Sequence, residues 1–345
     1  MALILGIEST CDETGVALVA DGRNVLANIV ASQVDLHAIY RGVVPEIASR
    51  AHIENILPVL RQALDSAAVR LDAVDAIAVA HRPGLIGSLL IGVTAAKSLA
   101  WALDKPLIAI DHVHAHLYSV KLQSDVEPAM PAVGLVCSGG HTALYEMQNF
   151  NDVKLIGSTI DDAVGEAYDK VATILGLGYP GGPAIDKLAE HGDPLAVKFP
   201  RTLLNRDSLD FSFSGLKTAV LYHVRGYQGR QHRLEDLTTQ QIADVAAGFQ
   251  AACIDVLVAK LDRARRRMNA KSIIIGGGVS ANRGLRQALA SFPIPVYFPP
   301  TEYCTDNAAM TAGLADINWH QRRFSDLSLD ALTSSEITRA ANGSA

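Results

Sequence analysis

Apolar positions divide the 345-residue chain into two similar halves. In each half, three short apolar runs separated by turns come first, and longer runs with helical spacing follow. The strands we expect are residues 2–8, 15–20 and 24–31 in the first half, and 132–137, 142–146 and 153–158 in the second. Short turns between consecutive strands predict an antiparallel meander at the start of each half.

After each meander the pattern changes to helices that alternate with strands. In the first half it predicts helices over 52–68 and 87–103 and strands over 76–80 and 106–110; in the second, helices over 163–175 and 242–267 and a strand over 272–275. Two successive β-β-β-α-β-α units predict a duplicated α/β fold of two lobes with a ligand cleft between the copies. Coincidence is the alternative, because hairpins followed by helices are common.

The polar, proline-marked stretch 125–131 is the expected boundary between the lobes. A helix over 307–321 is expected to close the chain, and the small, polar end to fray. The expected division gives residues 1–124 and a returning helix at 308–325 to the first lobe. Residues 128–307 form the second lobe, and 333–345 a flexible tail.

Composition restricts the class of protein. Apolar residues make up 49% and charged residues 19% of the chain, as in soluble globular enzymes. No apolar run reaches the roughly 18–20 residues of a membrane span. The four cysteines lie far apart without CxxC spacing, which favours a reducing cytosol and argues against a cysteine-based zinc site. At a net charge of −6, binding of nucleic acid would need a local basic patch.

Two histidines four residues apart follow the strand expected at 106–110. On a helix, His112 and His116 lie on one face and could share a transition metal, whereas His114 would point away. The alternative is a polar helix start in which the histidines cap, pair or face water. Asp306 is the best candidate for a third ligand later in the chain, but an Asp before an apolar helix is first of all a candidate N-cap.

Three glycine-rich turns stand at the ends of expected strands. They are residues 6–15, which carry Asp12 and Glu13, residues 137–142, and residues 275–283. Glycines allow a ligand to approach the backbone, and consecutive N–H groups can bind a phosphate. None matches the P-loop or the dinucleotide-binding fingerprint. Singly each is more often a tight turn, but three at equivalent strand ends favour a nucleotide.

Other segments allow more than one interpretation. Gly181 and Gly182 follow a helix that carries Asp169 and precede Asp186, so a pocket wall is plausible there, although a helix stop explains the preceding Gly178. The segment 222–233 mixes arginines with tyrosines, a composition used to bind RNA. The arginines at 263–267 lie on a helix whose charged face could simply be solvated.

Taken together, these motifs resemble one family over residues 4 to about 322, the TsaD family of tRNA adenosine threonylcarbamoyltransferases. The matching segments are Gly6-Ile7-Glu8, Cys11-Asp12-Glu13-Thr14, Gly42-Val43-Val44-Pro45-Glu46, Pro83-Gly84-Leu85, His112 to His116, Ser138-Gly139-Gly140-His141-Thr142, Asp161-Asp162, Gly165-Glu166, Asp169-Lys170, Tyr179-Pro180-Gly181-Gly182, Phe211 to Thr218, Gly277 to Asn282 and Cys304-Thr305-Asp306-Asn307. The resemblance implies the two-lobed actin-like ATPase (ASKHA) fold of the actin/Hsp70/sugar-kinase superfamily.

The resemblance also implies an activity and a site. A threonylcarbamoyl group would move from threonylcarbamoyl-AMP to the N6 amine of the adenosine beside the anticodon, in tRNAs that read codons beginning with A. One divalent metal, Fe²⁺ or else Zn²⁺, would be held by His112, His116 and Asp306. The implied substrate-binding residues are Cys137, Ser138, Gly139, Gly140, His141, Asp169, Gly182, Asp186 and Asn282. Asp12 and Glu13 match acids needed for activity, as catalytic residues whose role is open.

The implied partners are tRNA, a TsaB-like paralogue and a TsaE-like ATPase in the cytoplasm, with no membrane; a homodimer is left open. The chain departs from relatives at Arg41 and at His81-Arg82, and Val136 indicates the bacterial branch. Three rival classes are a metalloprotease, a small-molecule kinase and an RNA-binding scaffold. A metalloprotease would need the HExxH glutamate, which this chain lacks. A kinase would need Mg²⁺, which prefers oxygen ligands to histidines.

Overall fold

A computed structural model of the chain describes residues 2–40, 42–204, 207–226 and 234–334. It contains two compact units. Unit 1 consists of the described residues of Met1–Glu127 and Pro299–Ile337, and unit 2 of those of Pro128–Phe298. Residues 299–307 therefore pack with unit 1. The frayed end expected at 333–345 lies, from residue 335 onward, outside the described residues, and so do residues 227–233 of the basic segment.

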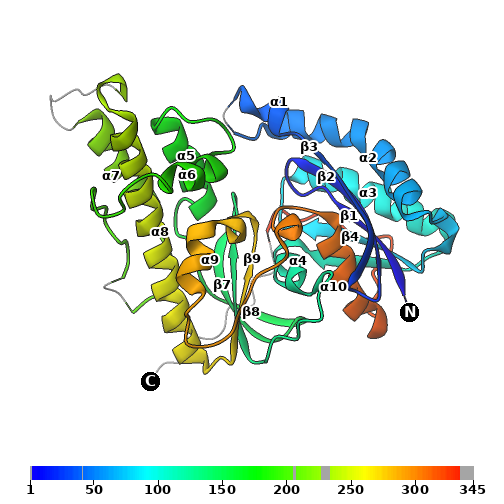
Figure 1. The fold of residues 1–345 in the computed structure, drawn as a ribbon. Helices are drawn as coiled ribbons and strands as arrows, with labels where there is room; N and C mark the ends of the chain where they lie inside the picture. The colour runs from blue at the N-terminus through cyan, green and yellow to red at the C-terminus, as the bar shows by residue number, and fades with distance from the viewer. Residues whose placement is uncertain (1, 41, 205–206, 227–233, 335–345) are drawn as a thin grey trace. The chain divides into compact units, whose positions relative to one another are not determined.

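Unit 1 is built on a five-stranded mixed sheet in the order β3-β2-β1-β4-β5, of which Figure 1 labels β1 to β4. The central strand β1 pairs antiparallel with β2, which pairs antiparallel with β3, and parallel with β4, which pairs parallel with β5. The strands are β1 (Leu3–Glu8), β2 (Glu13–Ala20), β3 (Asn24–Ser32), β4 (Ala76–Arg82) and β5 (Leu107–Asp111). The first meander is thus confirmed.

Helices cover this sheet because successive side chains of β1 point to opposite faces. Leu5 and Ile7 belong to a core shared with α2 (Pro45–Ala67) and α3 (Ile86–Leu103). Gly6, on the opposite face, lies against α10 (Ala308–His320), where an added Cβ would come within 2.5 Å of the Ala308 carbonyl oxygen. The remaining helices here are α1 (Val34–Ala38) and α4 (His112–Tyr118).

Unit 2 repeats the arrangement, with strands in the order β8-β7-β6-β9-β10. These are β6 (Ala132–Cys137), β7 (Thr142–Asn149), β8 (Asp152–Ser158), β9 (Ser272–Gly276) and β10 (Val296–Tyr297). Its helices are α5 (Val164–Ile174), α6 (Gly181–Ala189), α7 (Ser214–Arg225), α8 (Thr239–Met268) and α9 (Arg283–Leu289). One apolar core joins α5, α7, α8 and α9 to β6 and β9.

The two sheets share one topology, since β6 pairs antiparallel with β7 and parallel with β9, as β1 does with β2 and β4. The duplicated α/β fold predicted from the sequence is therefore confirmed. In each sheet the carboxyl ends of the parallel strands lie at one edge. Ligands of open α/β sheets bind beyond these ends, where His112 follows β5 and Cys137 ends β6.

Among the described residues, two helices are long and apolar enough to cross a membrane by length and composition alone, although neither is an uninterrupted apolar run. They are α3 (Ile86–Leu103) and α8 (Thr239–Met268). A third of the α3 window and two thirds of the α8 window are buried in the structure. Both helices are long and rich in apolar residues because each contributes to the core of its unit.

Candidate functional site

The helix that carries the paired histidines begins directly where β5 ends. Asp111, the last residue of β5, caps α4: its Oδ1 accepts hydrogen bonds from the N–H groups of Val113 at 3.0 Å and His114 at 3.3 Å. The cap starts the helix at His112. His112 and His116 are therefore one turn apart and both buried, with ring centroids 4.7 Å apart.

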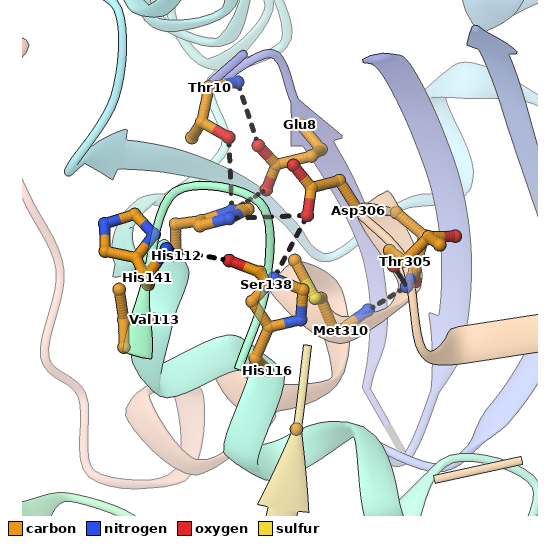
Figure 2. A network of polar contacts seen from close by, with 12 residues as sticks. Glu8, Thr10, His112, Val113, His116, Ser138, His141, Thr305, Asp306 and Met310 are labelled. Atoms are coloured by element: carbon orange, nitrogen blue, oxygen red, sulfur yellow. Dashed lines mark hydrogen bonds and ion pairs between the residues drawn. The ribbon is translucent and has the colours of Figure 1, made fainter. Parts of the chain in front are cut away.

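Asp306 completes a three-residue group with these histidines (Figure 2). Its Oδ1 lies 3.0 Å from Nε2 of His116 and 3.5 Å from Nε2 of His112. One donor atom from each residue falls within 4.8 Å of the others. Two imidazoles and one carboxylate form a donor set that transition metals prefer, and the three residues thus fit a metal.

Asp306 is not the N-cap of α10, the alternative that its position in the sequence left open. Asn307 holds that position, and its Oδ1 accepts a hydrogen bond from the N–H of Met310 at 3.1 Å. The Asp306 side chain is directed to the histidines instead.

Glu8, at the end of β1, holds His112 from the other side (Figure 2). Its Oε2 lies 3.1 Å from Nδ1 of His112, and its Oε1 accepts from the Thr10 N–H at 2.9 Å. Thr311 on α10 donates to the same Oε2 at 3.2 Å. Because a carboxylate only accepts, His112 donates from Nδ1 and turns Nε2 toward Asp306, the arrangement by which an outer carboxylate orients a metal-binding histidine.

The charges at this group favour a cation. Burial lowers the pKa of His112, but the carboxylates of Glu8 and Asp306 outweigh burial and raise the pKa to about 9. Nδ1 of His116 is buried and has no hydrogen-bond partner among the described residues. Without a metal, the imidazoles can satisfy Asp306 only by carrying protons, which a bound metal would displace.

The two acids of the first glycine-rich turn belong to the same unit. Asp12 is buried in the turn between β1 and β2, and Glu13 is the first, half-buried residue of β2. Burial, reinforced by the carboxylates of Asp306 and Asp12, raises the pKa of Glu13 well above its ordinary value. This raised pKa favours the protonated, neutral form of Glu13 beside the carboxylates of Asp12 and Asp306.

Unit 2 contains all the predicted substrate-binding residues. Cys137 is the buried last residue of β6, and residues 138–141 form the turn to β7. The N–H of Ser138 donates to the carbonyl of His141 at 2.8 Å, and the Ser138 hydroxyl accepts from the His141 N–H at 3.2 Å. A Cβ added to Gly139 or Gly140 would meet no atom of the described residues, which leaves room for a ligand beside the backbone.

The turn after β9 lies beside the turn after β6, because the two strands are parallel neighbours. Gly277 there has a φ of +88°, and an added Cβ would come within 2.5 Å of the Cys137 carbonyl oxygen, so this position requires glycine. Two glycine-rich turns thus meet at the carboxyl edge of the second sheet.

Asp186 and Asn282 are brought together in the same unit. The Asn282 amide donates to Asp186 Oδ1 at 3.0 Å and to the Gln250 side chain at 2.8 Å. Asn282 also caps α9 by accepting from the Leu285 N–H at 2.8 Å. Arg283 pairs with the other Asp186 oxygen, Oδ2, at 3.0 Å. This network holds both side chains in fixed orientations.

Asp169 bonds to the first residue of α6, which Gly182 follows. Asp169 Oδ1 accepts a hydrogen bond from the Gly181 N–H at 2.7 Å. A Cβ on Gly182 would meet no atom of the described residues. The predicted residues thus fall into two sets. Unit 1 holds the three candidate metal ligands and the two acids Asp12 and Glu13. Unit 2 holds the two glycine-rich turns and the polar side chains of Asp169, Asp186 and Asn282.

Sequence reasoning missed Glu8 and Thr10 as partners of His112, and Thr311 as a partner of Glu8. The signal for Glu8 was present, because an acid in the otherwise apolar run of residues 2–8 needs a polar partner once buried. No pattern in the sequence indicated that α10 would bring Thr311 to it.

Comparison with known proteins gives a consistent result. The family description of TsaD, tRNA N6-adenosine threonylcarbamoyltransferase, matches residues 24–313. Two proteins with this name, from Moorella thermoacetica and Symbiobacterium thermophilum, are 51% and 52% identical to this chain. The first match covers 95% of both chains; the second covers 96% of this chain and 95% of the relative.

Solved structures of low sequence identity share the fold. HypF from T. kodakarensis matches 95% of this chain and 49% of its own at a TM-score of 0.59 and 15% identity. Component A of the (R)-2-hydroxyglutaryl-CoA dehydratase from Acidaminococcus fermentans matches 92% of this chain and 99% of its own at a TM-score of 0.53 and 15% identity. Both are actin-like ATPase-fold proteins, so the predicted fold class is confirmed.

Proposed function

The chain belongs to the TsaD family of tRNA N6-adenosine threonylcarbamoyltransferases, and we propose that it takes the transferred group from threonylcarbamoyl-AMP. The acceptor is the N6 amine of the adenosine next to the anticodon, in tRNAs that read codons beginning with A. The observation that carries this proposal is the match of about half of all residues, over nearly the full length, to relatives with this activity.

We infer that His112, His116 and Asp306 hold one divalent metal per chain. Two histidines and a carboxylate are the ligand set of non-haem Fe²⁺ proteins, which supports iron, with Zn²⁺ as the alternative. When bound, such a metal stabilises negative charge that develops on a carbamoyl or phosphate oxygen. Metal analysis of protein purified without oxygen tests this assignment. About one iron per chain would support iron as the bound metal, whereas about one zinc per chain would identify zinc instead.

The substrate-binding residues proposed for the adenylate are those that unit 2 groups at the edge of its sheet. The open space beside Gly139, Gly140 and Gly182 supports this role, because a phosphate or sugar can approach the backbone there. The N–H groups of Gly139 and Gly140 are the proposed donors to an anion, and Asp186 and Asn282 offer fixed polar groups. The proposed set is Cys137, Ser138, Gly139, Gly140, His141, Asp169, Gly182, Asp186 and Asn282.

In the proposed reaction, the adenosine amine attacks the carbamoyl carbon. A C–N bond forms, the bond between that carbon and the phosphate oxygen breaks, and AMP leaves with the electron pair. The amine must also lose a proton, and we propose that Asp12 and Glu13 either orient the substrate or accept this proton. No covalent enzyme intermediate is needed. Cys137 suits such a role poorly, because its thiol is fully buried and donates to the Gly276 carbonyl.

The proposed partners are tRNA, a TsaB-like paralogue and a TsaE-like ATPase, working in the cytoplasm; a homodimer is a further candidate assembly. The family resemblance supports this set. The net charge of −6 also supports shared tRNA binding, since this chain offers no overall excess of positive charge.

The donor and the acceptor can be tested in one experiment. The chain, its two proposed partners, threonylcarbamoyl-AMP and unmodified tRNA are combined, and digested nucleosides are identified by mass spectrometry. A tRNA with guanosine in place of the adenosine next to the anticodon is the matched control. Threonylcarbamoyl-adenosine formed only with the adenosine tRNA supports the proposal. Product formed with the guanosine tRNA, or no product formed with the adenosine tRNA, would contradict the proposal.

A further inference from the structure

The turn that carries Asp12 and Glu13 is tied to three other elements through its backbone. The Thr10 carbonyl accepts from the N–H of Leu85, which precedes α3, at 2.8 Å. The Asp12 carbonyl accepts from the N–H of Gln33, which precedes α1, at 3.1 Å. The Cys11 carbonyl accepts from two side chains, His52 on α2 at 3.0 Å and Ser88 on α3 at 3.2 Å.

Among these groups, His52 alone bonds to residues on both sides of Asp12 and Glu13. Its Nε2 lies 3.0 Å from the Cys11 carbonyl oxygen, and its Nδ1 lies 2.8 Å from the hydroxyl of Thr14. Cys11 and Thr14 flank Asp12 and Glu13 directly in sequence. Both His52 and Thr14 are fully buried, so water does not replace either bond.

The hydrogen bonds define the state of the imidazole. A carbonyl oxygen can only accept, so His52 carries its proton on Nε2. Nδ1 of the neutral ring must then accept, and the Thr14 hydroxyl donates to it. Burial lowers the pKa of His52, which keeps the ring neutral. The ring thus bridges a backbone carbonyl and a side-chain hydroxyl in one fixed orientation.

We propose that His52 is a positioning residue, which through Cys11 and Thr14 fixes the two acids of the turn in the orientation that the transfer reaction uses. This inference rests on the proposed role of Asp12 and Glu13. His52 itself touches neither substrate nor metal ligands in this account. Misplacement of a reacting group by about 1 Å can cost on the order of 100-fold in rate, so the loss of one bridge has a measurable effect.

The Thr14 hydroxyl gives the sharpest test, because it can be removed without removing the buried ring. Thr14→Val deletes the donor to His52 and keeps a similar shape, whereas Thr14→Ser keeps the donor. Thr94→Val on the exposed side of α3 is the matched control for the same chemical change. kcat, KM for tRNA, bound metal and the thermal midpoint are measured for each, with Asp12→Asn and wild type alongside.

We expect Thr14→Val to lower kcat by roughly 10- to 100-fold with KM and bound metal unchanged. Thr14→Ser is expected to recover most of the lost kcat, and Thr94→Val to match wild type. Wild-type kcat in Thr14→Val, beside an inactive Asp12→Asn, would overturn the inference and leave the proposed function intact. A kcat loss that tracks lost metal would also overturn it. A metal-loaded wild type without product would refute the proposed function, and the inference with it.

Discussion

Carboxylates surround the two histidines at the carboxyl edge of the first sheet, and their roles differ by position. Asp306 faces both Nε2 atoms, and Glu8 faces Nδ1 of His112. His112 and His116 could be selected from their spacing alone. Asp306 could not be separated from an N-cap without the structure, because the adjacent Asn307 is an equally good capping residue. Glu8 was missed because its partner is 104 residues away in sequence.

Glu8 is predicted to support metal binding without being a ligand. Glu8→Gln removes the charge that orients His112, and outer partners of this kind are worth about 10- to 100-fold in metal affinity. We therefore expect metal affinity to fall by that factor, as measured by competition with a chelator of known affinity. Glu302→Gln, at an exposed position of the same unit, is the control and should leave affinity unchanged. Equal affinities of Glu8→Gln and wild type would refute this role.

Lys260 on α8 is predicted to make stability depend on pH. Its Nζ donates to the carbonyls of Leu203 and Ser208. Burial, reinforced by Arg263, lowers the pKa of Lys260 to about 8, below the roughly 10.4 of an unfolded lysine. Between these values the unfolded state binds more protons, so this group makes the native state more stable as pH rises from about 8 to 10.4.

The comparison that isolates this effect is Lys260→Gln, which keeps donors but cannot be charged. Urea unfolding of both proteins is measured from neutral pH to pH 10. The free energy of unfolding of wild type is expected to rise relative to that of the variant over this range. A constant difference between the two would show that the lysine has an ordinary pKa.

At the scale of elements, long periodic segments were predictable and short ones were not. The two meanders and α3, α5 and α8 lie where the apolar pattern placed them, since each contributes apolar side chains to the core of its unit. α2 begins at Pro45, not near residue 52 as expected, because Pro45 at the first helical position extends it N-terminally. α6 and α7 were not predicted; α6 opens with Gly181, Gly182 and Pro183, which are poor helix formers apart from their end positions.

The packing of α10 on β1 is predicted to depend on the absence of a side chain at residue 6. Gly6→Ala would place a Cβ 2.5 Å from the Ala308 carbonyl oxygen, so α10 must shift, at a cost of about 1–3 kcal/mol. Because Asp306 directly precedes Asn307, the N-cap of this helix, metal affinity should fall as well. Thermal unfolding and metal titration measure both effects.

Gly42→Ala is the matched control, since a Cβ there would meet no atom of the described residues. It should leave the thermal midpoint and the metal affinity close to those of wild type. If Gly6→Ala behaved like Gly42→Ala, α10 would not depend on this close approach to β1.

At the scale of the whole molecule, duplication explains why candidate residues fall at equivalent places. β1 and β6 are the central strands of their sheets, and each is followed by a turn rich in small and polar residues. The duplication could be predicted because the same order of strand and helix patterns occurs twice. The contact of Asp306 with the two histidines could not be predicted from this pattern, because only side-chain geometry brings these three residues together in unit 1.

The acidic net charge predicts that this chain alone binds tRNA weakly. At a net charge of −6, contacts with phosphates must come from local basic segments or from partners. We expect tRNA affinity at physiological salt, measured by fluorescence anisotropy, to increase when the TsaB-like and TsaE-like proteins are added. Tight binding by the isolated chain, unchanged by the partners, would contradict shared recognition.

The most direct test of the account is tRNA modification by wild type and by His116→Ala, with bound metal measured in the same samples. His320→Ala, an exposed histidine at the end of α10, is the matched control. We expect threonylcarbamoyl-adenosine and one metal per chain in wild type and His320→Ala, and loss of both in folded His116→Ala. Full modification by metal-free His116→Ala would contradict the role assigned to His112, His116 and Asp306.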